Sequence, residues 1–219
     1  MVSDHCLVLF TKPAIPGRVK TRLIGELSAD EAARLHAAFV DDLVERLGGG
    51  PYDLRIAWAL ESGDALPVMK TPGMRQEGND LGERLFRGLR ACAPGRGAVA
   101  AIGSDHPDLP AARVEEAFER LAEGASVVLG PADDGGYYLI ALPVDLVRRE
   151  IFEGIDWSTP RVLEQTVARC RSLGLEPSLL EPWADVDRPA DLRRLAASMA
   201  GSGGACPRTR ELLVSWGRL

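Results

Sequence analysis

The sequence lacks the features that mark several common classes of protein. Its 219 residues contain no CxxC pair and no cluster of cysteine and histidine, so we expect no structural zinc site. No apolar run approaches the ~18–20 residues that a membrane-spanning helix needs. The short apolar run at 6–10 has no basic flank before it, which argues against a secretory signal. Together with the scattered cysteines, this predicts a cytoplasmic protein.

Acidic residues outnumber basic ones, 32 to 26. The formal net charge is −6 and the sequence pI is about 5.2, whereas nucleic acids and anionic membranes select basic surfaces. We therefore expect neither a nucleic-acid nor a membrane partner, and any site for an anion must be local. No G-x-S-x-G motif and no cysteine–histidine arrangement is present, so covalent nucleophilic catalysis has no candidate residue.

Apolar runs alternate along the chain with amphipathic segments. This alternation predicts an α/β protein with a mostly parallel sheet and helices on both faces. Ser28 and Glu31 have the spacing of a capping box, and Ser158 or Thr159 is expected to cap a later helix with Pro160 in its first turn. Strands are expected at 5–11, 53–60, 97–103, 126–131 and 136–142, and helices at 28–47, 80–93, 111–124, 158–174 and 187–200.

The length fits one domain. We place this domain at residues 1–200. The GSGG segment at 201–204 is typical of a flexible link and begins a C-terminal tail, 201–219. Within this tail, TRELLVSW is expected to form a small helix.

Four polar segments, at 11–22, 103–108, 131–136 and 185–192, each follow an expected strand or extended piece. In parallel α/β sheets, ligands bind outside the carboxyl ends of the strands. The four segments should therefore meet at one edge of the sheet and form a site there.

The first of these segments, TKPAIPGRVKTR, is a basic loop. Gly17 permits close backbone approach to a ligand, and Arg18, Lys20 and Arg22 alternate after it, as suits a phosphate chain. The loop is not a Walker motif, because it lacks both the glycine spacing and the Gly-Lys pair. The alternative is a solvated loop whose charges balance nearby carboxylates.

Acidic residues follow two other expected strands. Asp105 and Asp108 come directly after a buried run, and such carboxylates suit Mg²⁺ or Mn²⁺. We favour the metal for Asp105, whereas Asp108 fits equally a metal ligand or a helix N-cap. His106 between them suits a second-shell or surface role. Asp187 is expected to cap the helix that follows it, and the alternative is that Asp185 or Asp187 supplies a further metal ligand. In PADDGG, the Gly-Gly pair permits close approach to a ligand, but an ordinary Asp-Gly hairpin turn is the alternative.

Taken in order, these segments resemble a known family over residues 5 to about 197. FTKPAIPGRVKTRL, QEGNDLGERL, GSDHPDLP, GPADDGGYYLIAL, IDWSTPRVLEQT and DVDRPADL resemble small bacterial GT-A-type, nucleotide-diphospho-sugar transferase-like proteins. Members are often labelled glycosyltransferases, some in connection with arsenosugar biosynthesis. The first loop is also similar to that of 2-phospho-lactate guanylyltransferases and, more distantly, of molybdenum-cofactor nucleotidyltransferases. This chain has Arg188 where Thr is usual and His106 where Cys is common.

The resemblance implies a Rossmann-like, three-layer α/β/α GT-A fold with a nucleotide over the first strand and loop. It implies Mg²⁺ or Mn²⁺ on Asp105 and Asp187, and a catalytic role for Arg18, Lys20 and Asp105. The acceptor side is expected at Asp134, Gly135, Gly136 and Trp157. The nucleotide is expected on Phe10, Thr11, Lys12, Gly17, Arg18, Lys20, Arg22, Gln76, Gly82 and Ser104.

Two reactions fit the fold and the site that the resemblance implies. In the first, an NTP donates its nucleotidyl group to a small phosphorylated or phosphonate-type acceptor and pyrophosphate leaves. In the second, a nucleotide sugar donates its glycosyl group. Three basic side chains in one loop favour nucleotidyl transfer, because a leaving pyrophosphate needs cationic help. A non-catalytic nucleotide-binding protein is the third alternative, and the sequence leaves a homo-oligomer open.

Overall fold

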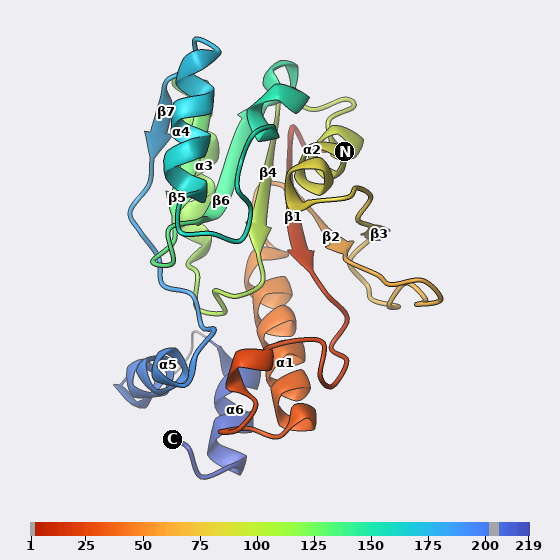
Figure 1. The fold of residues 1–219 in the computed structure, drawn as a ribbon, viewed down its shortest axis with the longest axis vertical. Coiled ribbons are helices and arrows are strands. Elements are labelled where there is room, and N and C mark those ends of the chain that lie inside the picture. The colour runs from red at the N-terminus through yellow and green to blue at the C-terminus, as the bar shows by residue number, and fades with distance from the viewer. Residues whose placement is uncertain (1–2, 202–205) are drawn as a thin grey trace.

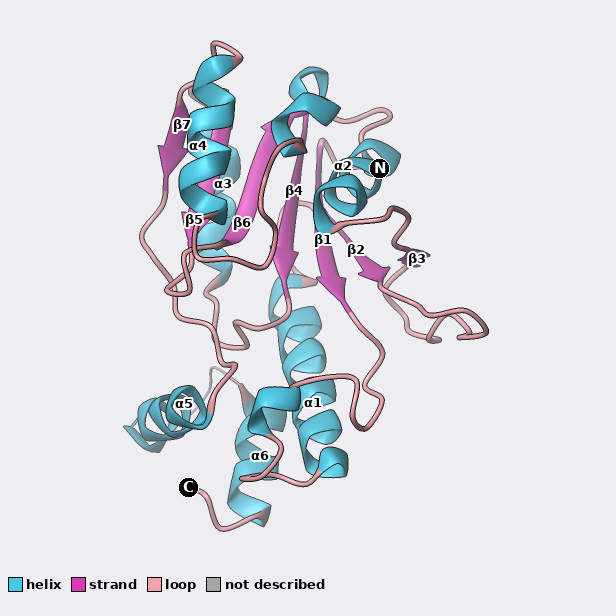
Figure 2. Cartoon of the chain, in the orientation of Figure 1, coloured by secondary structure: helices cyan, strands magenta, loops and turns pink. Residues whose placement is uncertain are grey.

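The computed structural model describes residues 3–201 and 206–219. Within these residues, seven strands form one sheet in the order β3-β2-β1-β4-β6-β5-β7, in which β6 is antiparallel to both of its neighbours (Figures 1 and 2). The expected α/β fold with a mostly parallel sheet is therefore confirmed. The strands are β1 (His5–Thr11), β2 (Asp53–Trp58), β3 (Gly73–Arg75), β4 (Ala98–Gly103), β5 (Val127–Pro131), β6 (Tyr137–Pro143) and β7 (Pro177–Leu179).

Side chains alternate across the sheet and build a core on each face. Leu7 and Leu9 of β1 belong to the cluster that α1 and α3 cover, whereas Val8 and Phe10 belong to the cluster under α2 and α4. This is the two-residue period of a strand that is buried on both faces. The helices are α1 (Ala29–Leu47), α2 (Leu81–Cys92), α3 (Ala111–Ala122), α4 (Val162–Ser172), α5 (Pro189–Gly201) and α6 (Pro207–Ser215), with 3₁₀ turns η1 (Thr21–Leu23), η2 (Val144–Leu146) and η3 (Arg149–Phe152).

A third apolar cluster lies beyond the sheet, where η1, α5 and α6 pack against α1 (Figure 1). Its fully buried members include Leu23, Phe39 and Leu213. The helix expected in TRELLVSW is confirmed as α6, and residues 202–204 of the expected link lie outside the described residues. The buried Asp42 carboxylate of α1 accepts hydrogen bonds from the first turn of α6, including one of 2.6 Å from the Thr209 hydroxyl.

Most predicted boundaries are confirmed, the predicted cap at Ser158 or Thr159 is wrong, and the cap alternative for Asp108 is excluded. The Ser28–Glu31 capping box is formed as expected. The helix predicted from 158 begins only at Val162, because Ser158 takes φ 65° and the Thr159 hydroxyl closes a local turn instead. Asp108 does not cap α3, whose N-cap position is Pro110, and its carboxylate accepts a hydrogen bond from Trp183.

The cysteines lie inside the fold. Cys6, Cys92, Cys170 and Cys206 are all buried and free, as expected of the Cys6 thiol in an apolar strand. In the described part of the chain, no helix combines the length and the apolar character needed to cross a membrane.

Candidate active site at the carboxyl edge of the sheet

The order in which strands are added to the sheet reverses between β1 and β4. It runs outward from β1 to β2 and β3, then returns to β4 on the other side of β1. Such a switch point is where open α/β sheets bind ligands. The segment before α5 crosses here, since Val186 N donates to Asp105 O at 2.9 Å and His106 Nδ1 lies 3.1 Å from Ala184 O. Two of the four expected segments, 103–108 and 185–192, therefore meet here, and Lys20 brings the first segment to the same place.

Lys20 lies at the centre of this meeting point. Its side chain is only 2 % exposed, although it comes from a loop. Its ammonium donates to a carboxylate oxygen of Asp105, to Asp187 Oδ1 at 3.1 Å and to the Val186 carbonyl at 2.7 Å. These contacts use all three donors of the ammonium. The backbone at Lys20 is left-handed, with φ 46°, a strained conformation that residues at functional sites adopt more often than others.

The charges around Lys20 stabilise each other. Burial alone would lower the pKa of Lys20, but the charges of Asp105 and Asp187 outweigh burial and raise it. Burial likewise would raise the pKa of Asp105, and the Lys20 charge and hydrogen bond lower it instead. The Lys20 ammonium and the Asp105 carboxylate therefore each favour the charged form of the other.

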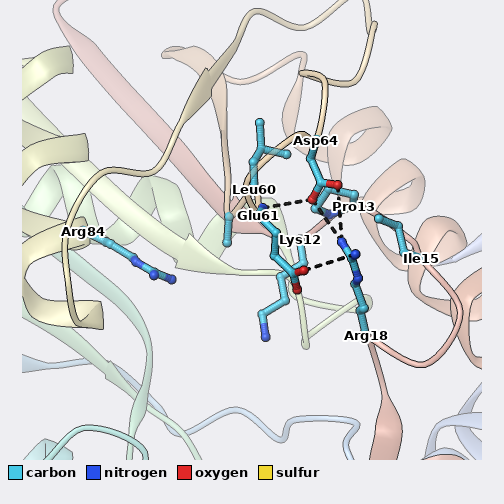
Figure 3. Close-up of a pocket in the computed structure, with 9 residues that line it drawn as sticks. Lys12, Pro13, Ile15, Arg18, Leu60, Glu61, Asp64 and Arg84 are labelled. Atoms are coloured by element: carbon cyan, nitrogen blue, oxygen red, sulfur yellow. Dashed lines mark hydrogen bonds and ion pairs between the residues drawn. The ribbon is translucent and has the colours of Figure 1, made fainter.

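The other two basic residues of the loop also face carboxylates. Arg22 lies 3.2 Å from Asp187 Oδ2, and Arg18 lies 3.1 Å from both Asp64 and Glu61 (Figure 3). The alternative given above, a loop whose charges balance nearby carboxylates, thus describes Arg18 and Arg22. It does not describe Lys20, which is buried and not solvated.

Behind the loop lies a buried network of hydroxyl and imidazole groups. Thr11 Oγ1 donates to Ser104 Oγ at 3.0 Å and lies 3.1 Å from His36 Nε2, which is also 3.1 Å from the Lys12 carbonyl. Because a carbonyl only accepts, Nε2 carries the proton. His36 Nδ1 is buried and has no hydrogen-bond partner among the described residues, and burial lowers the pKa of this imidazole.

The predicted nucleotide residues divide into structural and accessible ones. The Phe10 ring packs against Gly88 of α2. The Gln76 amide donates to the carbonyls of Thr11 and Ala57 and joins the ends of β1 and β2. Gly17 lies on the exposed loop at φ 78°, and no described atom outside its chain neighbours lies within 4 Å of the place of a Cβ, so this side of its backbone is open to a ligand.

A cavity of about 230 Å³ opens beside the basic loop, at the ends of β1 and β2 (Figure 3). Arg84 enters it from α2, on the side opposite Arg18, and is held by a 3.0 Å hydrogen bond from its Nε to Gly78 O. Among the described residues, neither Lys12 nor Arg84 has a carboxylate within ion-pair distance. Arg84 lies in the QEGNDLGERL segment, but its helical position gave no reason to single it out. The lining residues are Lys12, Pro13, Ile15, Arg18, Ala59, Leu60, Glu61, Asp64 and Arg84.

The residues expected on the acceptor side lie in two places. Asp134 accepts a 2.8 Å hydrogen bond from Gly136 N within the turn between β5 and β6, so this segment is the hairpin turn given above as the alternative. Gly135 has φ 87° and no room for a Cβ against Pro160. Trp157 packs against Gly82 and lines a second cavity, of about 160 Å³, between α2 and η3.

The carboxylates fit a hard divalent cation by their chemistry. In the described residues, no group of three or more His, Cys, Asp or Glu side chains is arranged to hold a metal. Mg²⁺ needs no such cage, because it is commonly held by one or two carboxylates together with substrate phosphates and water. Asp105 and Asp187 supply two such carboxylates, and in this structure the Lys20 ammonium lies between them.

Comparison with solved structures gives a close relative. A protein from Desulfovibrio desulfuricans G20, described as a candidate nucleotide-diphospho-sugar transferase, is 35% identical with a TM-score of 0.91, over 98% of this chain and 95% of that one. Residues 53–159 match the profile of DUF2064, an uncharacterized protein conserved in bacteria. This chain belongs to the same family as the Desulfovibrio desulfuricans protein. No curated protein matches the chain.

The chain shares its fold with nucleotidyltransferases at much lower identity. A cytidylyltransferase from Leptospira borgpetersenii serovar Hardjo-bovis is 8% identical with a TM-score of 0.61, over 99% of this chain and 94% of that one. A CMP:2-keto-3-deoxy-manno-octonic acid synthetase complexed with CTP is 13% identical with a TM-score of 0.53, over 91% and 99%. These likenesses confirm the GT-A-like fold. The resemblances to arsenosugar-associated proteins and to 2-phospho-lactate guanylyltransferases stay predictions.

Proposed function

We propose that the chain is a nucleotidyltransferase. It transfers an NMP group from an NTP to a small phosphorylated or phosphonate-type acceptor and uses Mg²⁺ or Mn²⁺. One observation supports this most directly: two carboxylates from separate loops flank a single cation position, and the same basic loop lines a cavity in which two cations have no carboxylate partner among the described residues. The carboxylates are Asp105 and Asp187, and the cations are Lys12 and Arg84.

The proposed reaction assigns each group a role. An acceptor oxygen attacks the α-phosphorus, the bond to the bridging oxygen breaks, and its electrons leave with pyrophosphate. Lys12 and Arg84 bind the β- and γ-phosphates and stabilise the leaving group. A cation on Asp105 and Asp187 would neutralise charge on the reacting phosphate oxygens. Arg22, which pairs with Asp187, and the exposed Arg188 suit an anionic acceptor.

The alternative is glycosyl transfer from a nucleotide sugar. It is favoured by the relative from Desulfovibrio desulfuricans, which is described as a candidate nucleotide-diphospho-sugar transferase. The same two carboxylates would then hold a cation against the departing diphosphate. The two reactions differ in donor and in leaving group, so a binding panel separates them.

A thermal-shift panel with Mg²⁺ and NTPs, NDPs or nucleotide sugars tests the proposal. A hundredfold excess of ligand over its Kd should stabilise the fold by about 2.7 kcal/mol. If an NTP stabilises most, release of pyrophosphate with phosphorylated or phosphonate acceptors is the expected activity. A larger effect of NDPs and nucleotide sugars would transfer the assignment to the glycosyltransferase. Binding of NTP without any product from the acceptor set would support the non-catalytic alternative.

A further inference from the structure

Lys20 is one of few lysines in the chain, and it is the buried one among them. Only three of the 26 basic residues are lysines, and of these Lys12 and Lys70 are exposed. Lys20 is buried and carries a compact ammonium, the side-chain group most like a metal ion in being a point charge. It also contacts the two carboxylates best suited to a divalent cation.

The ammonium and a metal ion need the same oxygen atoms. The Lys20 nitrogen bonds Asp105 and lies 3.1 Å from Asp187 Oδ1. Mg²⁺ binds its oxygen ligands at about 2.0–2.1 Å, so a cation that both carboxylates hold through these two oxygens lies close to the place of the ammonium. A divalent cation and the Lys20 ammonium that shared these oxygens would also lie close enough to repel each other strongly in a partly buried site.

An ammonium that leaves this place needs new acceptors. Its other acceptor, the Val186 carbonyl, belongs to the same buried cluster and offers no alternative position. The loop that supplies Lys20 also lines the cavity assigned above to the nucleotide phosphates. Phosphate oxygens there are strong acceptors for an ammonium, so a bound nucleotide provides what the apo protein lacks.

We infer that Lys20 occupies the cation position of the apo protein, and that a divalent cation and the Lys20 ammonium exclude each other between Asp105 and Asp187. The cation therefore binds together with the nucleotide, whose phosphates receive the displaced ammonium. The nucleotide half of this inference rests on the proposed function. The exclusion half concerns only the cation and the protein.

Binding of Mn²⁺ to the protein without nucleotide, followed by calorimetry and by electron paramagnetic resonance, tests the exclusion. Lys20→Met removes the ammonium and should tighten Mn²⁺ binding by about tenfold to a hundredfold, the usual range of coupling between two sites. Lys20→Arg keeps the charge and should bind Mn²⁺ as weakly as the wild type. Arg22→Met is the matched control, because it removes the same charge from beside the same Asp187 but from a 63 % exposed side chain. Equal affinities in Lys20→Met and Arg22→Met would overturn the inference, since only general electrostatics would then be at work.

A second measurement uses the wild type and does not depend on the folding of a variant. Acetylation by an N-hydroxysuccinimide ester, quantified by mass spectrometry, should spare Lys20 and modify the exposed Lys12 and Lys70. Saturating Mn²⁺ should raise the acetylation of Lys20 alone. Protection of Lys20 that persists at saturating Mn²⁺ would contradict the exclusion.

These results separate the inference from the proposed function. If the exclusion holds but no nucleotide binds, the proposed function fails and Lys20 remains a competitor of the cation. If a nucleotide binds with Mg²⁺ and Lys20→Met gains no affinity for Mn²⁺, the proposed function stands and the inference fails.

Discussion

Lys12 and Arg84 differ from the other cations around the cavity, because neither has a carboxylate partner among the described residues. Arg18 is neutralised by Glu61 and Asp64, and Lys20 by Asp105 and Asp187. A phosphate chain that meets Arg18 or Lys20 must first break an ion pair. One that meets Lys12 or Arg84 need only displace water.

Arg84→Met should therefore weaken the binding of an NTP. A charge-assisted hydrogen bond is worth about 1.5–3 kcal/mol, which corresponds to a loss of about tenfold to a hundredfold in affinity. The loss should be largest at low salt, because salt screens phosphate contacts. Titration calorimetry at two ionic strengths measures this. Arg87→Met, on the same helix but paired with Glu83, is the control, and equal affinities in the two variants would remove Arg84 from the site.

His36 makes the stability of the fold depend on pH. Its folded pKa is lowered by burial, with Asp105, Lys20 and Lys12 as the charged groups around it. The unfolded chain therefore binds a proton more readily than the folded one, so stability falls as pH drops below the ordinary value of about 6.5. Urea unfolding between about pH 5 and pH 7.5 should show a decline of up to about 1.4 kcal/mol per pH unit from this one proton. His36→Gln should flatten the decline, and parallel profiles of the two proteins would show that other groups cause it.

At the scale of elements, the sequence predicts strands and helices well where the apolar pattern is long. β1 is mostly apolar because both of its faces are buried. The capping box of α1 depends only on Ser28 and Glu31, three positions apart, so the local sequence predicts it. β3 was not predicted, because it is only three residues long and, among the described strands, pairs with β2 alone. The late start of α4 was also missed, because the turn at Ser158 forms through contacts that no helix signal reveals.

The sequence predicted where the candidate site lies but not which of its side chains form ion pairs. The order of strands fixes which loops meet, so Asp105, Asp187 and the basic loop could be placed at one edge of the sheet. The direction of each side chain in an irregular loop depends on contacts with distant residues. The ion pair of Arg18 with Asp64 and the burial of Lys20 are such contacts, and neither leaves a pattern in the sequence.

At the scale of the whole molecule, the third apolar cluster connects the two halves of the site. η1 follows Lys20 directly and contributes Leu23 to the cluster, while α5 follows Asp187 closely and contributes Leu195. α6 closes the same cluster with Leu213. The last helix therefore supports the two segments that bring the cation and one of its carboxylates together.

Truncation after Ala200 tests both this support and the predicted division of the chain into a domain at 1–200 and a tail. Removing α6 takes the fully buried Leu213 out of the cluster, and a buried Leu→Ala change alone costs about 2–5 kcal/mol. We expect the truncated chain to unfold at clearly lower urea and to bind nucleotide more weakly, because η1 and α5 lose their common support. Leu213→Ala and the 52 % exposed Val214→Ala form a matched pair if the truncated chain is insoluble, with a loss expected only in the first. A truncated chain as stable as the full one would instead make 1–200 a self-sufficient domain, and would mean that the packing of α6 contributes little to the site.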